Sequence, residues 1–219
     1  MRVPRTVLAL AAAGLVLVAF EPAADAAAAN PSALVTELCA QLGQVLSDRT
    51  LSSAEQKQRF RAILDADFDF RVISRFVLGR YWQGSSDAFH REFAGVFEDY
   101  VIQSLSVRFA DARGDSVRIT GTLSESARST IVSTMIAHPD GTSQPNVDWR
   151  IEDTPDGLRI ADISVAGVSM AMTYREQIAS VIDHDGGQVA SVIPTLRAKI
   201  DHGKHDVASG DSPATVGAQ

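Results

Sequence analysis

The chain has 219 residues, 45% of them hydrophobic, and a formal net charge of −7 at pH 7. This length suits one domain with a sizeable core. The acidic balance argues against nucleic acid, which binds clustered Lys and Arg, and against loose adsorption to anionic lipid surfaces. The single cysteine, Cys39, excludes an intramolecular disulfide. It lies at helical spacing from Val35 and Leu42, so we expect a buried, small apolar residue there.

The first residues have the pattern of a secretory signal peptide. Arg2 and Arg5 precede an apolar run over 7–20, and Ala24-Asp25-Ala26 fits the cleavage rule for such peptides. The apolar run has about 14 residues, whereas a membrane-spanning helix needs roughly 20. No cysteine follows it directly, which disfavours a lipoprotein anchor. We therefore expect residues 1–26 to be removed on export.

Two helices are predicted at the start of the domain. Apolar residues recur at helical spacing over 34–46. A Ser52-x-x-Glu55 capping box then opens a segment whose apolar residues again follow a helical period up to Leu64.

Two more helices are predicted from the aromatic part of the chain. Asp69 can cap a short helix that Gly79 ends. Ser85 or Ser86 then begins a longer helix, which carries a wide, aromatic-rich apolar face over 89–105.

From Asp115 the apolar period changes to two, which is typical of strands. One strand is predicted in 116–126 and three more in 129–165, with turns at Asp140-Gly141 and Asp156-Gly157. Helices, then strands, then helices indicate an α+β fold, with a twisted antiparallel sheet of about four strands packed against a layer of helices.

The last part of the chain returns to a helical period. Apolar residues over 170–182 share one face, and the His-Asp-Gly-Gly sequence at 184–187 ends that helix. A final helix is predicted over 189–200, with Pro194 in its first turn or at a kink. Beyond it, residues 202–219 are polar and contain Gly, Ser and Pro, so we expect a disordered tail after a single domain over 27–201.

Ser169 is the strongest catalytic candidate. It lies in a Gly-Val-Ser-Met-Ala sequence at a strand-to-helix turn, like a nucleophile elbow, with Asp183 and His184 downstream. The second glycine of that motif is missing, the sheet is predicted to be antiparallel, and neighbouring Asp183 and His184 diverge on a helix. Ser169 is better explained as the N-cap of its helix, so a small hydrolase is only an alternative and no enzyme is expected.

No metal or cofactor is expected. His202 and His205 lie in the predicted tail, and Asp183-His184-Asp185 sits beside a helix end, so neither set has rigid further ligands. The sequence has no P-loop, GxGxxG or CxxC motif.

Three stretches together resemble the MlaC family, also called toluene-tolerance auxiliary proteins: FDFRVISRFVLGRYW (68–82), FHREFAGVFEDYVIQSL (89–105) and DISVAGVSMAMTYREQIASVIDHDGGQVASVIPTLR (162–197). The resemblance runs from the first helix to about Ile200. Members are periplasmic phospholipid-binding carriers. The resemblance therefore implies a sheet and helices that enclose an apolar cavity for acyl chains, with the lipid headgroup near solvent.

We expect the apolar residues of the aromatic helices, the inward strand positions and the GVSMA segment to bind lipid. These are Ile73, Val77, Phe93, Phe97, Tyr100, Val101, Leu105, Ile119, Val132, Trp149, Ile151, Ile163, Val165, Val168 and Met172. Arg75, Arg80 and Tyr81 flank the short helix, and we expect them near the cavity mouth, where a phosphate can meet a cation. Surface ion pairs are the alternative for these three.

The resemblance also implies location and partners. It places the protein in the periplasm, between an outer-membrane lipoprotein complex and an inner-membrane MCE-domain protein with its ABC transporter. Family members associated with hopanoid synthesis share the architecture, so a triterpenoid or another lipid is an alternative cargo. An ordinary dry core behind the aromatic faces, or a purely structural adaptor, stays open as well. Either would yield no lipid on organic extraction.

Overall fold

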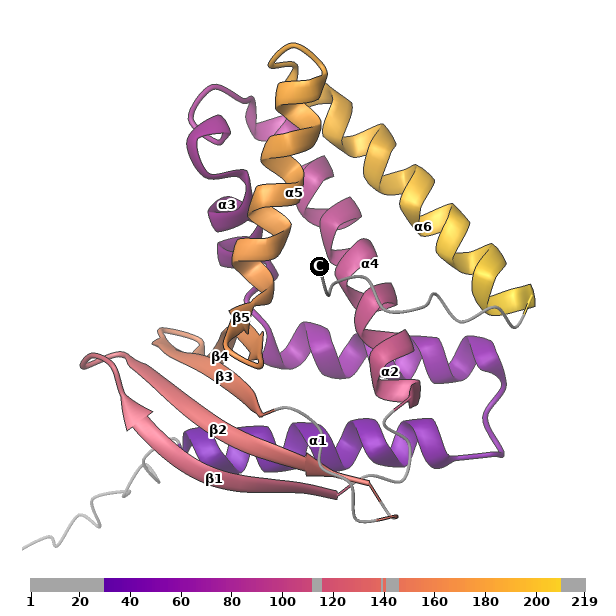
Figure 1. Ribbon diagram of the computed structural model, residues 1–219, viewed down its shortest axis with the longest axis vertical. Coiled ribbons are helices and arrows are strands. Elements are labelled where there is room, and N and C mark those ends of the chain that lie inside the picture. The colour runs from indigo at the N-terminus through magenta and orange to yellow at the C-terminus, as the bar shows by residue number, and fades with distance from the viewer. Residues whose placement is uncertain (1–29, 112–115, 139, 141–145, 210–219) are drawn as a thin grey trace, which may run out of the picture.

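The computed structural model describes residues 30–111, 116–138, 140 and 146–209 (Figure 1). Helices come first, then an antiparallel sheet, then helices again. The predicted α+β fold class is therefore confirmed. The expected signal peptide, residues 1–26, lies outside the described residues and stays a prediction.

Local capping signals start the first two helices. α1 spans Pro31–Ser47, and the Asn30 side chain accepts hydrogen bonds from N–H groups of its first turn. α2 spans Ser53–Asp67 and carries the predicted capping box. Ser52 Oγ accepts the N–H of Glu55, whose carboxylate accepts the N–H of Ser52 in return. Both helix starts could thus be read from a few adjacent residues.

The short helix α3 spans Phe70–Leu78, and the Asp69 carboxylate caps it as predicted. Gly79 ends it with a φ of +52°, a conformation that glycine adopts without steric cost, and a 3₁₀ turn, η1, follows over Gly79–Tyr81. The residue pattern of α3 buries Ile73 and Val77 on one face.

The long helix α4 spans Asp87–Asp111. It starts where Ser86 Oγ accepts the N–H of Phe89, so Ser86 rather than Ser85 occupies the capping position. Phe93 and Phe97 are fully buried on its predicted apolar face.

The sheet has five antiparallel strands in the order β1-β2-β3-β4-β5. They are β1 Ser116–Ser124, β2 Ser129–Ala137, β3 Val147–Thr154, β4 Gly157–Val165 and β5 Val168–Ser169. The first four are the predicted meander. β5 was not predicted, because two residues are too short to show alternation. The Asp156-Gly157 turn joins β3 to β4 as expected, whereas the Asp140-Gly141 turn includes a residue outside the described ranges.

Two helices close the described chain. α5 spans Met170–His184, and Gly186 and Gly187 follow it with positive φ, as expected. After the 3₁₀ turn η2, Val189–Ser191, α6 spans Val192–Ser209, with Pro194 in its first turn.

The predicted end of the last helix near Ile200 is wrong, because α6 continues to Ser209. A glycine such as Gly203 usually disfavours a helix. Here its lack of a side chain lets α4 pack closely against α6. Gln103 Nε2 donates to the Ile200 carbonyl at 3.0 Å, and a Cβ at residue 203 would lie 2.7 Å from that nitrogen. The part of the expected tail over 210–219 lies outside the described residues.

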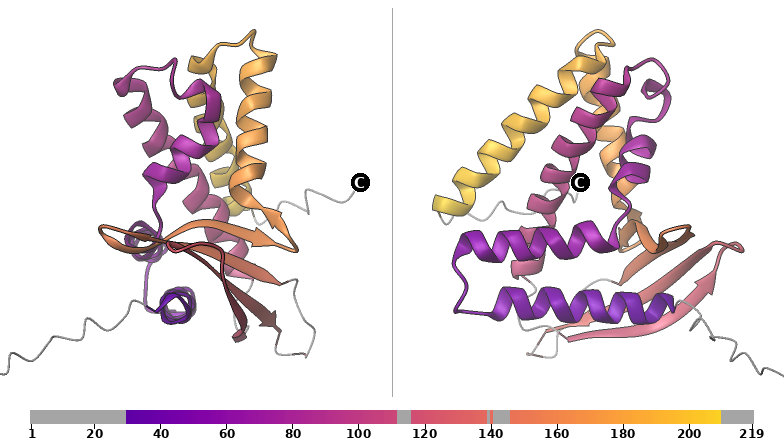
Figure 2. Two further views of the ribbon diagram at one scale, coloured as in Figure 1. Left: turned by 90° about the vertical axis from the view of Figure 1, so that its left-hand side faces the viewer. Right: turned by 180° about the vertical axis from the view of Figure 1, so that it is seen from behind.

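The helices form two groups around the sheet. α1 packs against β1 and β2, and α2 lies alongside α1. α3, α4, α5 and α6 stand together on one side of the sheet (Figure 2), where α3 and α5 contact β4 and α6 packs along α4. One apolar cluster joins residues of all these layers. None of the helices within the described ranges has the length and apolarity needed to span a membrane.

Candidate functional site

A ladder of aromatic rings runs along α4 and ends on α5. Phe89, Phe93 and Phe97 follow each other at four-residue spacing, with ring centroids 6.1 and 5.6 Å apart. Tyr174 meets this ladder edge-on, with its ring 5.5 Å from Phe97 and 5.7 Å from Tyr100. Edge-to-face and offset rings are favourable beyond the area that they bury. The ladder therefore fixes how α4 and α5 pack.

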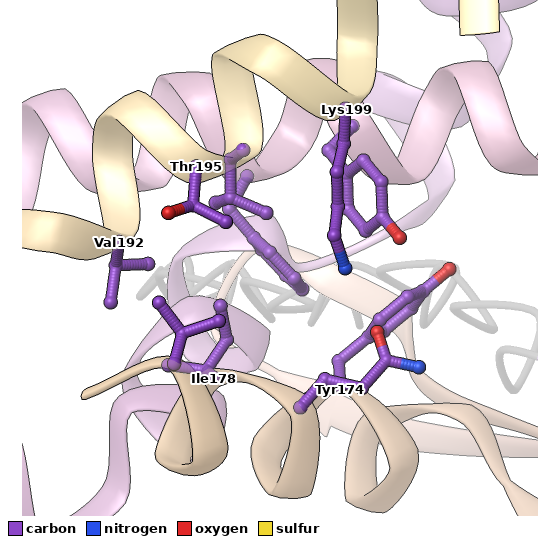
Figure 3. Close-up of a pocket in the computed structure, with 10 residues that line it drawn as sticks. Tyr174, Ile178, Val192, Thr195 and Lys199 are labelled. Atoms are coloured by element: carbon purple, nitrogen blue, oxygen red, sulfur yellow. The ribbon is translucent and has the colours of Figure 1, made fainter. Parts of the chain in front are cut away.

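A pocket lies at the end of the ladder, between α4, α5 and α6 (Figure 3). Its lining residues are Phe97, Tyr100, Tyr174, Gln177, Ile178, Val181, Val192, Thr195, Leu196 and Lys199. The free volume is about 10 Å³, which is room for about one water molecule. In this structure the pocket is closed by its own side chains and is not a cavity of acyl-chain size.

The pocket is apolar inside and polar at its mouth. Ile178 and Leu196 are buried, whereas Lys199 is exposed and its Nζ lies 5.8 Å from the centre of the Tyr100 ring. In Figure 3 the Lys199 amine points into the space that it shares with Tyr174. Lys199 forms no ion pair with any residue that the structure describes. An apolar pocket beside an unpaired cation suits an amphipathic anion.

Most of the predicted lipid-binding residues lie inside the molecule. Those that are buried are Ile73, Val77, Phe93, Phe97, Val101, Leu105, Val132, Trp149, Ile151 and Ile163, and those partly buried against them are Tyr100, Ile119 and Val165. Phe97 and Tyr100 also line the pocket. The lipid-binding role of all these residues stays a prediction.

Val168 and Met172 do not lie inside. Val168 is 63% exposed on β5, and Met172 is 45% exposed on α5, whose inward face is formed by Ala171, Tyr174 and Ile178. Both side chains lie at the surface, and neither lines the pocket between α4, α5 and α6.

The predicted headgroup residues separate into two places. The Tyr81 hydroxyl donates to Asp183 Oδ1 at 2.7 Å, and Arg80 pairs with the same carboxylate at 3.4 Å. The hydrogen bond to Tyr81, followed by nearby charges, raises the pKa of Arg80. Arg75 lies elsewhere, in a groove with Arg175. Arg80 thus forms a surface ion pair and Tyr81 a hydrogen bond with the same carboxylate, and the headgroup role of Arg75, Arg80 and Tyr81 stays a prediction.

The pocket residues from α5 and α6 were missing from the predicted lipid-binding set. The helical period had placed Tyr174, Ile178 and Leu196 on apolar faces, but it could not say that these faces meet α4. Nothing in the sequence indicates a binding role for Lys199, because a single lysine near the end of a helix is common.

Ser169 caps α5 as predicted. Its Oγ accepts the N–H of Met172 at 3.0 Å and donates to Asp162 Oδ2 at 2.5 Å. His184 lies at the other end of α5, about 22 Å from Ser169 along the helix axis at 1.5 Å per residue. The pair therefore cannot form the nucleophile and base of a hydrolase.

We expect Ser169→Ala to lower the free energy of unfolding by about 1 kcal/mol, because a capped amide loses its partner. Ser169→Thr should keep most of that stability, since threonine also caps helices. Urea unfolding of both variants measures the difference. Equal stability of Ser169→Ala and the natural chain would contradict the capping role.

Cys39 is half-buried and packs against the core. Burial raises the pKa of its thiol to about 12, so it stays uncharged at neutral pH, as expected of a small apolar residue. In the part of the chain that the structure describes, no group of three or more His, Cys, Asp or Glu side chains could hold a metal ion.

Comparison with known proteins agrees with the architecture. A solved structure of a phospholipid-binding protein from Ralstonia solanacearum, in complex with a phospholipid, matches with a TM-score of 0.70 and 20% sequence identity. The match covers 80% of this chain and 99% of that chain, and at this identity it shows a shared fold. No curated protein matches the sequence. The sequence model of the MlaC protein family matches residues 33–198, well over half of the chain, and the chain therefore belongs to the MlaC family.

Proposed function

We propose that the protein binds a phospholipid, with the acyl chains between α4, α5 and α6, and carries it across the periplasm. The observation that carries the proposal is the closed pocket between α4, α5 and α6, which combines apolar walls with the unpaired cation of Lys199. Membership of the MlaC family and the phospholipid bound to the Ralstonia solanacearum protein support it.

Loading must widen the pocket. Pockets that bury a drug-sized ligand measure roughly 300–1,000 Å³, far more than the volume found here, and a phospholipid is no smaller than such a ligand. α6 packs on α4 and α5, and Gly186 and Gly187 connect it to α5 with positive φ. A shift of α6 about this connection would separate the pocket walls. With its walls together, the pocket buries its apolar lining against its own side chains and avoids the cost of a large void.

The energetics suit a carrier. Two acyl chains of roughly 16 carbons avoid on the order of 25 kcal/mol of exposure to water when they are buried. A bilayer interior is equally apolar, so exchange between the membrane and the protein changes the free energy little. The direction of lipid transport must then be set by partner proteins. We propose an outer-membrane lipoprotein complex at one end and an inner-membrane MCE-domain protein with its ABC transporter at the other.

Native mass spectrometry of protein taken from the periplasm, followed by lipid extraction, tests the proposal. We expect a bound mass that extraction resolves into a diacyl phospholipid. A triterpenoid in its place would correct the cargo. Absence of any lipid, together with a periplasmic fraction that lacks the protein, would contradict both the carrier and its location.

Lys199 gives a sharper test of the mouth of the pocket. We expect Lys199→Gln to weaken phospholipid retention roughly fivefold, because an exposed ion pair is worth about 1 kcal/mol at most. Salt should reduce the difference, since it screens exposed charges. Lys57→Gln, at an exposed position on α2, is the matched control and should retain lipid normally. Equal retention in all three proteins would remove Lys199 from the site.

A further inference from the structure

A second hollow lies between α3 and α5, and Figure 1 shows α3 on the opposite side of α5 from α6. Its lining residues are Val72, Arg75, Phe76, Gly79, Trp82, Gln83 and Arg175, and we call it the α3–α5 groove. It has a free volume of about 300 Å³ and is open to solvent. The proposed lipid pocket shares none of these residues.

The walls of the groove are held in place. The Arg175 guanidinium lies over the Phe76 ring, 5.1 Å from its centre. It also crosses the backbone of Gly79, where a Cβ would lie only 3.0 Å from the guanidinium carbon. Trp82 stacks on His90 with ring centroids 3.8 Å apart. Gly79 thus ends α3 and, because it has no side chain, leaves room for the Arg175 guanidinium. These contacts fix the walls, so the groove is preformed.

The groove is basic on an acidic protein. Arg75 and Arg175 form no ion pair with any residue in the described ranges, and no carboxylate lines the groove. The chain as a whole has a net charge of −7. Two unpaired guanidinium groups in one hollow select for an anion, and their planar donors match a carboxylate well.

Exposed apolar side chains accompany these charges. Val72 is 45% exposed and Phe76 39% exposed, both on the outer face of α3. Met172 lies one helical turn before Arg175 on α5 and is exposed too. Clusters of this kind on a soluble protein mark interaction sites, and Trp and Arg are the residue types that dominate binding energy at protein interfaces.

We infer that the α3–α5 groove is a docking site for a segment of a partner protein that presents a carboxylate beside a large apolar side chain. A bilayer is a poorer occupant. The groove is concave, Arg175 covers one face of Phe76, and the overall negative charge opposes approach to anionic lipid. The inference does not depend on the cargo, since it rests on a separate surface.

Site-specific photo-crosslinking in the cells that produce the protein tests the inference. Gln83 is exposed on the groove and can be replaced by p-benzoylphenylalanine, and the same replacement at exposed Leu123 on β1 is the control. We expect a protein adduct at position 83 and not at 123. Mass spectrometry of the crosslinked peptide should place an Asp or Glu within one helical turn of the contact point.

Charge exchange then tests the recognition itself. Arg75→Glu should reduce the adduct several-fold, and replacement of the identified carboxylate by arginine in the partner should restore it. Arg91→Glu, which makes the same charge change at an exposed position on α4, should leave the adduct unchanged. A lipid adduct, a contact segment without a carboxylate, insensitivity to Arg75→Glu, or no product beyond that at position 123 would each overturn the inference.

Discussion

Delipidation is expected to lower the melting temperature of the protein by roughly 5–10 °C. A lipid that binds the folded chain and not the unfolded chain adds about 2.7 kcal/mol when it is present at about 100 times its Kd. For a domain of this size, each kcal/mol corresponds to about 2–4 °C. The measurement compares the melting temperature of protein as purified with that of the same protein after mild extraction, with bound lipid determined by mass spectrometry in both.

Reconstitution with the extracted phospholipid is the control for damage during delipidation. It should restore the higher melting temperature, and titration should raise it progressively with lipid concentration. A delipidated protein that melts at the same temperature as the loaded one, or that does not respond to added lipid, would contradict a cargo bound within the fold.

Features set by adjacent residues could be predicted from the sequence. The Ser52–Glu55 capping box, the Asp69 cap and the stop at Gly79 each depend on a few neighbours, and all three are present. The alternation of apolar residues over 129–165 likewise predicted three of the strands. Helix starts and ends can be predicted in this way because the capping side chain satisfies or blocks backbone groups in its own turn.

Features that depend on which elements meet could not be predicted. Arg80 pairs with Asp183, which lies 103 positions away in the chain, and nothing near either residue indicates the pairing. The role of Gly203 required knowledge that Gln103 of α4 lies against it. The candidate pocket is of this kind too, since Lys199 becomes notable only when α6 packs on α4.

The expected lipid-binding role came from the family resemblance, because the periodicity of apolar residues does not indicate it. The aromatic face of α4 is equally compatible with a dry core, and side chains nearly fill the pocket between α4, α5 and α6. A closed pocket of this size therefore fits both a carrier and a dry core. They differ in how lipid content and stability respond to a substitution that fills the pocket with a large side chain.

Val181→Trp is expected to reduce co-purifying phospholipid by about tenfold or more, equivalent to at least 1.4 kcal/mol of binding free energy. Val181 is half-buried on α5 and lines the pocket, so an indole ring can occupy the space that opens on loading. Because the side chain is only half-buried, the delipidated variant should lose less than the 1–3 kcal/mol or so typical of overpacked cores.

The same substitution at Val168 is the matched control. Val168 is the most exposed of the large apolar residues in the described ranges, so Val168→Trp should change neither lipid content nor stability. Lipid per protein by mass spectrometry and urea unfolding of the delipidated proteins give the two readouts. If Val181→Trp unfolds easily and the natural chain carries no lipid, the pocket is part of a dry core. If Val181→Trp is stable and still carries a full complement of lipid, the acyl chains bind elsewhere in the fold and α6 is not the element that opens.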